Sequence, residues 1–352
     1  MGESLPWAAL RKGVVHRPGG VERLAVEQHP DPVPGSGEVL IDVAAAGVNF
    51  ADVAVRLGLY ASAKQYVGWP ITPGFEVSGR VAALGAGVSA PRMGAEVMAV
   101  TRFGGYVSHL VVPADQTGPL PPGFGLRQAG GFPVVFLTAW YALRRMLHAE
   151  AGETVLVHSA AGGVGCALLQ LARAFGVRSV GVVSSAAKVE AARAAGADVV
   201  IDTSRADLWE AARGAAPGGF DGVLDANGGP SLRNSYRHLA PGGRLVAYGF
   251  HTLFKRGSDR IDRLRLAAGW LRMPRFDPLK MTNENKSVLA FNLSYLFDRR
   301  DILSRALAEL DELARAGRIR PPPTTEVPLA EVAEAHRRLQ SGATVGKLVL
   351  VP

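Results

Sequence analysis

The residues HSAAGGVGC at 158–166 have the composition of a loop that binds phosphate. In the dinucleotide fingerprint Gly-x-Gly-x-x-Gly, the second Gly lets the backbone approach a pyrophosphate and the third lets a helix pack closely on a strand. Gly162 and Gly165 hold these two positions, and Ala160 holds the first, where Ala is compatible with a turn that does not need positive φ. The amides that open the following helix would face the phosphates. The loop alone also fits a plain strand-to-helix turn, and its candidate cofactor contacts are Ala161, Gly162, Gly163 and Val164.

The residues after the second strand of this segment indicate which dinucleotide would bind. An NAD site normally has Asp or Glu there, because a carboxylate holds the ribose 2′-hydroxyl. This chain has VVSSAAK, so Ser184, Ser185 and Lys188 offer two hydroxyls and a positive charge, and Arg205 could add a second charge. These groups would attract a 2′-phosphate, and we expect NADP(H) as the cofactor.

Cys166 is the single cysteine of the chain. A lone cysteine excludes an intrachain disulfide and a four-cysteine zinc site. A helix start could lower the pKa of its thiol and make it reactive. Because a small apolar side chain is what packs well at this position, we expect a structural role for Cys166.

The loop depends on the elements that hold it. TVLVH predicts a strand before it, and CALLQLARAFG predicts a helix after it. From Gly152 onward, further strands and helices of about ten residues alternate, which is typical of a doubly wound parallel sheet. KSVLAFNLSYLF is predicted as one more strand. Before residue 131 the chain shows strand-length runs between Gly and Pro, with one short helix at 50–57. The fold class is therefore α/β, with a β-rich part joined to a parallel sheet.

Length, composition and charge exclude several classes of protein. The 352 residues favour two domains, and 48% hydrophobic with 20% charged residues is ordinary for a globular chain. Residues 251–280 hold eight Lys or Arg and three Asp, so +5 of the net charge of +8 lies in one segment. No nucleic-acid-binding motif accompanies this charge, and nucleic acid is not expected as a partner.

The same basic segment contains an apolar pattern. Ile261, Leu264, Ala268 and Leu271 recur at helical spacing, which predicts a short amphipathic helix. Three roles stay open: a cap that recruits an anionic substrate, attachment to anionic membranes, or a solvated surface excursion. Elsewhere no apolar run reaches the roughly 20 residues that span a bilayer, and the N-terminus lacks the pattern of a signal peptide. We therefore expect a cytoplasmic protein without membrane contact.

A set of motifs, in a fixed order over nearly the whole chain, resembles a known family. They are AAGVNFADV with GLY, PITPGFEVSGRVAALGAGV, FGGYVSHLVVPAD, LTAWYAL, AAGGVG and GKLVLVP. Together they resemble the medium-chain dehydrogenase/reductase superfamily, in its zinc-free quinone oxidoreductase branch and the subgroup around the VAT-1 homologue. The resemblance implies a GroES-like β-rich catalytic domain at 1–135 and 296–352, and a Rossmann NADP(H)-binding domain at 136–295 with the basic insertion at 251–284. It places the active site in the cleft, and we expect a homodimer.

The resemblance also bears on zinc. In the zinc-dependent branch a Cys stands where this chain has Asn49, a His where it has Phe75, and a third metal-binding Cys near Val134. Amide, phenyl and isopropyl groups do not make a usable zinc ligand set. No metal site is expected, and oxidation of an alcohol through a metal-bound alkoxide is therefore not expected.

Without a Lewis acid, hydride transfer needs an acceptor that is already electrophilic, such as a carbon–carbon double bond conjugated to a carbonyl, or a quinone. Hydride adds to the β-carbon, and donors stabilise the enolate that forms until a proton reaches the α-carbon. Tyr60 is the first candidate for that proton, and Tyr66 a weaker one. The Asn49 amide could bind the substrate carbonyl or the nicotinamide ribose. Asp52 is a catalytic candidate as well, with orientation of the loop as its expected role and direct chemistry as the alternative.

The remaining candidates lie on the cofactor side. Residues after the carboxyl ends of parallel strands line the crevice of such a sheet, and the resemblance adds contacts near the nicotinamide and at the C-terminal end. The candidates are Thr138, Asn227, Gly249, Phe250, Phe291, Leu293 and Lys347. The leading hypothesis is an NADPH-dependent reductase of conjugated double bonds or quinones. The alternatives are a reductive cyclase of natural-product biosynthesis and a cofactor-binding interaction protein without turnover.

Overall fold

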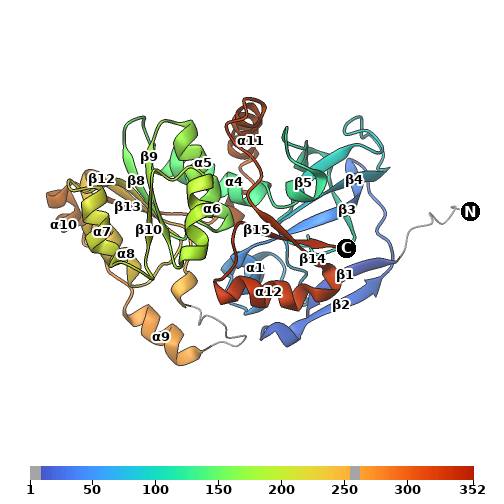
Figure 1. Ribbon diagram of the computed structural model, residues 1–352. Coiled ribbons are helices and arrows are strands. Elements are labelled where there is room, and N and C mark those ends of the chain that lie inside the picture. Colours follow the sequence, from blue (N-terminus) through green and yellow to red (C-terminus); the bar gives the residue numbers. More distant parts are fainter. Residues whose placement is uncertain (1–8, 254–261) are drawn as a thin grey trace, which may run out of the picture. The chain divides into compact units, whose positions relative to one another are not determined.

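The structure is a computed structural model that describes residues 9–253 and 262–352 and separates into two compact units (Figure 1). Unit 1 takes its described residues from Met1–Val134, Thr324–Ser341 and Leu348–Pro352. Unit 2 takes its residues from Val135–Pro323 and Gly342–Lys347. Each unit is therefore built from segments that are far apart in the sequence.

Unit 1 is the β-rich part. Its larger sheet has seven strands in the order β14-β15-β3-β4-β5-β7, with β6 also paired to β3, and a separate pair joins β1 to β2. The strands are β1 (Leu10–Val15), β2 (Leu24–His29), β3 (Glu38–Val48), β4 (Glu76–Leu84), β5 (Glu96–Val100), β6 (His109–Pro113), β7 (Thr117–Pro119), β14 (Thr324–Pro328) and β15 (Lys347–Val351). The C-terminal strand β15 pairs antiparallel with the end of β3, so the last strand of the chain completes a sheet that begins in its N-terminal part.

Short helices join and cover these strands: α1 (Phe50–Arg56), α2 (Ala61–Tyr66), α3 (Leu126–Ala129) and α12 (Val332–Ser341). The helix expected at 50–57 is confirmed as α1. It begins where Asn49 leaves β3 in an extended conformation and the Asp52 side chain accepts a hydrogen bond from the Asn49 N–H. That contact is one half of a capping box, and it fixes the first turn of the helix.

Unit 2 is the doubly wound part. Its sheet has the order β10-β9-β8-β11-β12-β13, and every neighbouring pair is parallel. The strands are β8 (Thr154–Val157), β9 (Arg178–Val183), β10 (Val199–Asp202), β11 (Phe220–Asp225), β12 (Leu239–Ala247) and β13 (Ser287–Ala290). The order reverses between β8 and β11, which is where doubly wound sheets bind ligands.

Helices cover both faces of this sheet. They are α4 (Pro133–Trp140), which continues as a π-helix at Tyr141–Met146, α5 (Gly163–Ala174), α6 (Val189–Ala194), α7 (Leu208–Ala215), α8 (Ser231–Arg237) and α11 (Arg300–Arg315). Figure 1 shows α5 and α6 on one side of the sheet and α7 and α8 on the other, as right-handed crossovers require. Strand side chains such as Leu156 and Val223 pack with Ala212 of α7 and Leu232 of α8 in one buried cluster. Each fully buried Leu or Val contributes about 1.5–3 kcal/mol. Together the two units confirm the expected fold class, a GroES-like β-rich domain with a Rossmann-type parallel sheet.

The division between the units differs from the expected boundaries in the C-terminal part. The sequence predicted a return to the β-rich domain at residue 296, whereas unit 2 continues to Pro323 and also takes residues 342–347. The reason lies in α11, whose Glu309 accepts a hydrogen bond from Trp140 Nε1 at 2.6 Å and pairs with Arg144 at 3.2 Å. These contacts tie α11 to α4 and the π-helix of unit 2.

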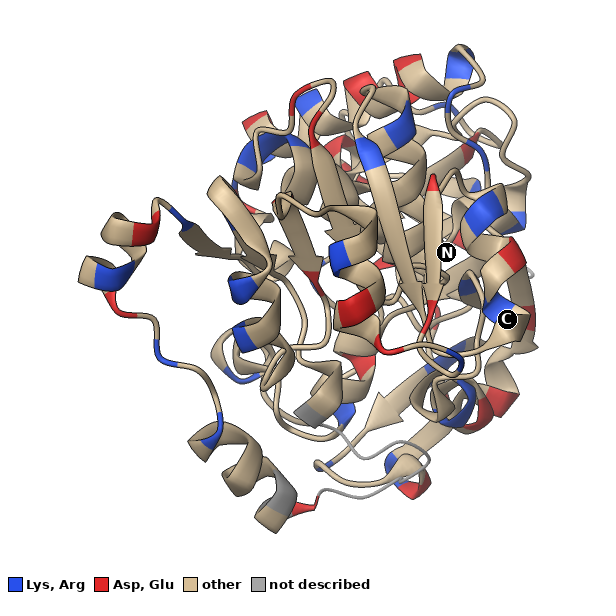
Figure 2. Ribbon diagram, turned by 60° about the vertical axis from the view of Figure 1, so that its left-hand side comes forward, with Lys and Arg blue, Asp and Glu red and all other residues tan. Residues whose placement is uncertain are grey.

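Of the basic segment at 251–280, the structure describes residues 251–253 and 262–280, so Lys255, Arg256, Arg260 and Ile261 lie outside the described residues. The expected helix is present as α9 (Arg263–Leu271), followed by α10 (Pro278–Glu284). Leu264 and Leu271 are exposed on α9, and Figure 2 shows cationic positions along the segment between α9 and α10.

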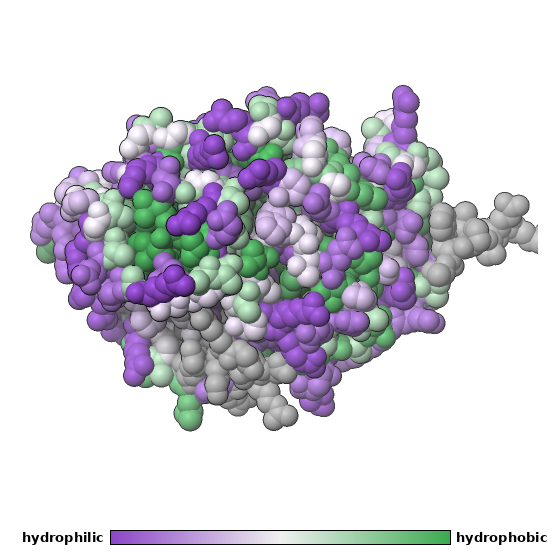
Figure 3. All heavy atoms as spheres, viewed as in Figure 1, coloured by the Kyte–Doolittle hydropathy of each residue, from purple (hydrophilic) through white to green (hydrophobic). Residues whose placement is uncertain are grey.

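Figure 3 shows a visible surface that is mostly hydrophilic, with hydrophobic areas between the polar residues. Among the helices within 9–253 and 262–352, none is both long and apolar enough to cross a membrane.

Candidate active site

The predicted phosphate loop joins β8 to α5 in unit 2. Ser159 takes a left-handed conformation with φ of 54°, whereas Ala160 is not among the residues with positive φ. The Ala160 N–H donates to the carbonyl of Val182 at 3.0 Å, which fixes the loop to β9. Ala therefore fits in the first Gly position, because the unusual backbone conformation falls one residue earlier.

Gly165 has no room for a side chain. A Cβ there would lie 2.7 Å from the carbonyl carbon of Ala160 and closer still to the carbonyl oxygen of Ser159. A Cβ at Gly162, the N-cap of α5, would meet only the Ser159 oxygen, at 3.3 Å. The first-turn amides of an α-helix have no intrahelical acceptors, so the start of α5 offers donors beside an open Gly162. This cradle fits a pyrophosphate.

The C-terminal GK pair lies beside the same loop within unit 2. Gly346 donates its N–H to the carbonyl of Ala161 at 2.8 Å. The Lys347 side chain is buried, and its Cδ would lie 3.4 Å from a Cβ at Gly163. Two candidates that are 184 residues apart, Gly163 and Lys347, thus meet.

Ser184, Ser185 and Lys188 follow the carboxyl end of β9, as the sequence predicted. The Lys188 ammonium donates to the carbonyl of Gly342, in a partly buried position. The neighbouring carboxylate at the end of β10, Asp202, accepts from Ser204, and this lowers the pKa of Asp202. After β9, where an NAD site has a carboxylate, this chain has the hydroxyl groups of Ser184 and Ser185 and the ammonium group of Lys188.

Asn227 is held by a buried network that the sequence did not predict. Burial lowers the pKa of His158, so its ring is neutral and only one nitrogen carries a proton. Asn227 Nδ2 lies 3.3 Å from His158 Nδ1, and His158 Nε2 lies 3.1 Å from Ser235 Oγ, which donates to Asp225 at 2.8 Å. If His158 Nε2 carries the proton, each contact has one donor and one acceptor: Asn227 donates to His158, His158 donates to Ser235, and Ser235 donates to Asp225. His158 and Asp225 follow or end parallel strands, and that position is the signal that could have identified them.

The remaining cofactor candidates of unit 2 are described by their packing and burial. Phe291 packs against Tyr141 and Tyr248, with ring centroids 4.9 and 6.3 Å apart. Phe250 is partly exposed after β12, and Gly249 before it lies close to the carbonyl of Ala226. Thr138 is buried on α4, and Leu293 opens a 3₁₀ turn after β13.

In unit 1 the candidates Asn49 and Asp52 meet at the start of α1. Asp52 accepts from the backbone N–H groups of Asn49, at 2.7 Å, and Gly74, at 2.8 Å. Glu76 accepts from Asn49 Nδ2 at 2.9 Å and from the Val134 N–H at 2.7 Å. Asp52 and Glu76 are both fully buried. The two carboxylates thus fix the backbone and the side chain of Asn49 separately.

This geometry brings together the three positions that bear on zinc. Asn49 and Val134 both bind Glu76, and Phe75 directly precedes it in the chain. A zinc ion needs Cys, His or carboxylate ligands in tetrahedral geometry. An amide, a phenyl ring and an isopropyl group do not fit that need. Within the described ranges, no group of three or more His, Cys, Asp or Glu is placed to hold a metal ion.

Tyr60 lies in an aromatic cluster next to this site. Its ring meets Phe75 edge-on at 5.8 Å and Phe103 at 6.5 Å, and these two phenylalanines are 5.1 Å apart. Tyr66 has a different environment, because it is partly exposed and the Arg102 guanidinium stacks 4.0 Å above its ring.

Cys166 is 1% exposed on α5, and burial raises the pKa of its thiol to about 12. A thiolate is therefore scarce near neutral pH, and the helix start does not make this cysteine a nucleophile. The expected structural role agrees with this burial.

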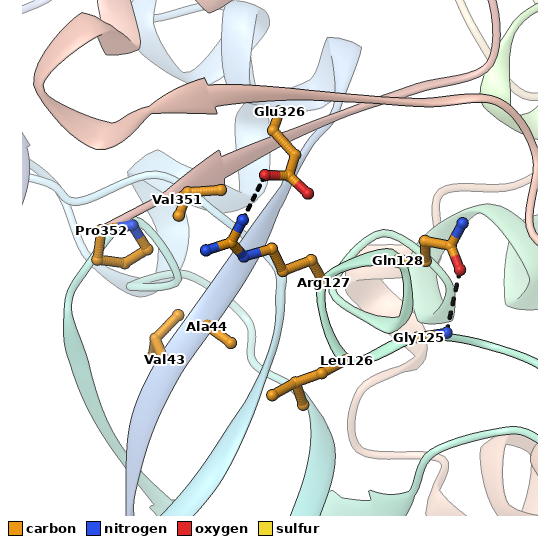
Figure 4. A pocket seen from close by; sticks show the side chains of 9 residues that line it. All are labelled: Val43, Ala44, Gly125, Leu126, Arg127, Gln128, Glu326, Val351 and Pro352. Carbon is orange, nitrogen blue, oxygen red and sulfur yellow. Dashed lines mark hydrogen bonds and ion pairs between the residues drawn. The ribbon is translucent and has the colours of Figure 1, made fainter.

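A pocket of about 610 Å³ lies in unit 1. It lies between the irregular part of β3 and the end of β15 (Figure 4). Arg127 and Glu326, which line it, pair with each other at 2.7 Å. None of the predicted site residues lines this pocket.

Comparisons with known proteins agree with the fold and the order of the motifs. Residues 35–122 match the alcohol dehydrogenase GroES-like domain, and residues 195–350 match the zinc-binding dehydrogenase family. The synaptic vesicle membrane protein VAT-1 homolog of Rattus norvegicus is 34% identical over 336 residues, which cover 95% of this chain and 82% of that protein.

Solved structures give the same result. Escherichia coli quinone oxidoreductase, complexed with NADPH, matches with a TM-score of 0.83 and 28% identity, over 97% of this chain and 100% of that one. The CurK enoyl reductase matches with a TM-score of 0.83 and 26% identity, over 98% and 99%. The chain therefore belongs to the medium-chain dehydrogenase/reductase superfamily, among its quinone oxidoreductase-like and VAT-1-like members.

Proposed function

We propose that this oxidoreductase uses NADPH to reduce a carbonyl-conjugated double bond or a quinone of a small molecule, without zinc. The observation that carries the proposal is the set of side chains around Glu76. Asn49, Phe75 and Val134 offer no zinc ligand set, yet the buried carboxylates Asp52 and Glu76 hold the Asn49 amide in place. Such a site suits a substrate that needs hydrogen bonding rather than a Lewis acid.

The residues proposed to hold NADPH lie in unit 2. The amides at the start of α5 would bind the pyrophosphate, with Gly162 allowing its approach. Ser184, Ser185 and Lys188 would bind the 2′-phosphate. Asn227, oriented by His158, and the backbone near Phe291 would contact the rest of the cofactor. NADPH, when bound, supplies a hydride from nicotinamide C4.

The residues proposed to act on the substrate lie in unit 1. The Asn49 amide, fixed by Glu76, would donate to the substrate carbonyl and stabilise the negative charge that develops on its oxygen. Tyr60, packed edge-on against Phe75 and Phe103, would give its hydroxyl proton to the α-carbon and regain one from water. Asp52 would orient Asn49 through the backbone. The individual residue roles, the homodimer and the cytoplasmic location stay predictions.

An assay of NADPH oxidation tests the proposal. We expect absorbance at 340 nm to fall when the purified protein meets a panel of enones, quinones and conjugated polyenes. Turnover should be unchanged after dialysis against a zinc chelator, and the product should gain two mass units without a new ring. Binding of NADPH without oxidation by any panel member would contradict the reductase proposal, and a new ring in the product would favour the cyclase.

Cofactor preference gives a second prediction. We expect Lys188→Glu to lower kcat/KM for NADPH about 10- to 100-fold, because a hydrogen bond between charged groups contributes about 1.5–3 kcal/mol. The value for NADH should change by less than about threefold, since the ribose hydroxyl carries no charge. Lys280→Glu, on the exposed helix α10, is a matched charge change that should leave both values unaltered. Equal losses with both cofactors would contradict a 2′-phosphate contact.

A further inference from the structure

A buried polar cluster in unit 1 connects the C-terminal helix α12 to α1. Arg56, at the end of α1, is fully buried. Its Nε donates to His336 Nδ1 at 3.3 Å, its Nη1 to the carbonyl of Gly19 at 2.8 Å, and its Nη2 to Gln340 Oε1 at 2.6 Å. Burying a guanidinium costs several kcal/mol of free energy unless its N–H groups are hydrogen-bonded. These three hydrogen bonds of Arg56 offset that cost.

The direction of the hydrogen bonds in this cluster follows from Arg56. A guanidinium can only donate, so His336 Nδ1 must accept. Burial lowers the pKa of His336, and the nearby Arg56 lowers it further, so the ring is neutral and its proton lies on Nε2. Nε2 then donates to the Tyr106 hydroxyl oxygen, 3.2 Å away. Burial raises the pKa of Tyr106, and the charge of Asp52 and a hydrogen bond to the Asp52 side chain raise it further, so the Tyr106 hydroxyl keeps its proton and is the donor to Asp52.

The chain of donors therefore ends at Asp52. Its four members, Arg56, His336, Tyr106 and Asp52, are all fully buried. Asp52 in turn accepts hydrogen bonds from the backbone N–H groups of Asn49 and Gly74, so its position fixes the backbone at both residues. Hydrogen bonds that point the same way polarise one another. A positive group on one side and a carboxylate on the other thus hold two backbone segments, one carrying Asn49 and one leading to Phe75.

We propose that Arg56, His336 and Tyr106 are positioning residues, which act through Asp52 to hold the Asn49 amide where it binds the substrate carbonyl. The role of Asn49 rests on the proposed function, whereas the constraint on the backbone does not. Positioning matters because a displacement of about 1 Å at a reacting group can cost roughly 100-fold in rate.

The first test removes one oxygen atom. Tyr106→Phe breaks the chain in the middle but keeps the ring, which meets the His336 ring edge-on at 5.9 Å. We expect kcat to fall about 10- to 100-fold while the Kd for NADPH stays within about twofold. Hydrogen exchange, measured by NMR, should become at least about tenfold faster at the Asn49 and Gly74 amides than in the wild type, and remain unchanged in β4. Tyr236→Phe, at a buried tyrosine of unit 2, is the control and should change neither quantity.

A double variant separates positioning from a general loss of stability. If Tyr106 acts through Asn49, Tyr106→Phe should lower kcat much less in an Asn49→Ala background than in the wild type. His336→Gln should retain kcat within about fivefold, because one amide can accept from Arg56 and donate to Tyr106. His336→Leu can do neither and should lose at least as much as Tyr106→Phe.

The outcomes distinguish the two proposals. If Tyr106→Phe leaves the exchange of the Asn49 and Gly74 amides unchanged, the positioning proposal is wrong, whatever the activity. If exchange responds but the wild type reduces no panel substrate, the positioning of the backbone holds and the proposed function fails. If exchange responds and kcat does not, the network is structural only, and the positioning proposal is overturned.

Discussion

Gly165→Ala is expected to lower the free energy of unfolding by about 3 kcal/mol and the melting temperature by roughly 6–12 °C. The physical reason is that the new methyl group would overlap the backbone of Ser159 and Ala160. Backbone atoms cannot rotate away as a flexible side chain can. Relief therefore requires α5 to separate from β8, which moves the helix start away from the loop. We expect the affinity for NADPH to fall at least about 100-fold, as measured by fluorescence titration.

Gly162→Ala is the matched control for this variant. A Cβ there meets only one atom, at 3.3 Å, so the melting temperature should stay within about 2 °C of the wild type. The methyl group would still occupy the approach of the pyrophosphate, and we expect the Kd for NADPH to rise about tenfold or more. Loss of binding without loss of stability at Gly162, and loss of both at Gly165, is the expected pair of results. Wild-type binding by both variants would show that this loop does not hold the cofactor.

Arg56→Met is expected to lower the free energy of unfolding by about 3–5 kcal/mol. Methionine fills much of the volume but donates no hydrogen bond. His336 Nδ1 and Gln340 Oε1 would each lose a donor in a buried site, and the carbonyl of Gly19 would lose one in a partly buried site. An unsatisfied buried acceptor costs about 1–3 kcal/mol. Urea unfolding followed by circular dichroism measures the change.

The control is an arginine in the same unit with an exposed partner. Arg80 pairs with Glu96 on the surface, and Arg80→Met should cost less than about 1 kcal/mol. If Arg56→Met prevents soluble expression, Arg56→Lys keeps the charge but not the three donor directions and should give an intermediate loss. A change below about 1 kcal/mol for Arg56→Met would contradict the view that these acceptors depend on it.

The local patterns were sufficient to predict most of the fold. TVLV is an uninterrupted apolar run because β8 is buried on both faces in the middle of a parallel sheet. Gly caps and Ala-rich segments placed α5 and α6 correctly. Asn49 and Asp52 were predicted through the family resemblance, whose motif AAGVNFADV contains both, and the structure joins them by a local hydrogen bond.

The errors arise where a polar side chain or a distant contact decides the structure. KSVLAFNLSYLF was predicted as one strand, but β13 ends at Ala290, and Asn292 then accepts from the Ser294 N–H at 3.0 Å and starts a 3₁₀ turn. Unit 2 extends past residue 296, where the sequence predicted a return to the β-rich domain, because α11 packs on α4 through Glu309. The α2 helix was not predicted. No local pattern indicates that Arg56 donates a hydrogen bond to His336, which lies 280 residues later.

That separation has a consequence for synthesis. Ribosomes add about 5–20 residues per second, so Arg56 is made roughly 15–60 seconds before His336 and Gln340, which lie 280 and 284 residues further along. During this interval the guanidinium has neither partner, and β3 lacks β15 along one edge. The parallel sheet of unit 2 is complete in the nascent chain once β13 has been made. We therefore expect the parallel sheet to form during translation while the N-terminal half of the β-rich unit still lacks β15 and the partners of Arg56.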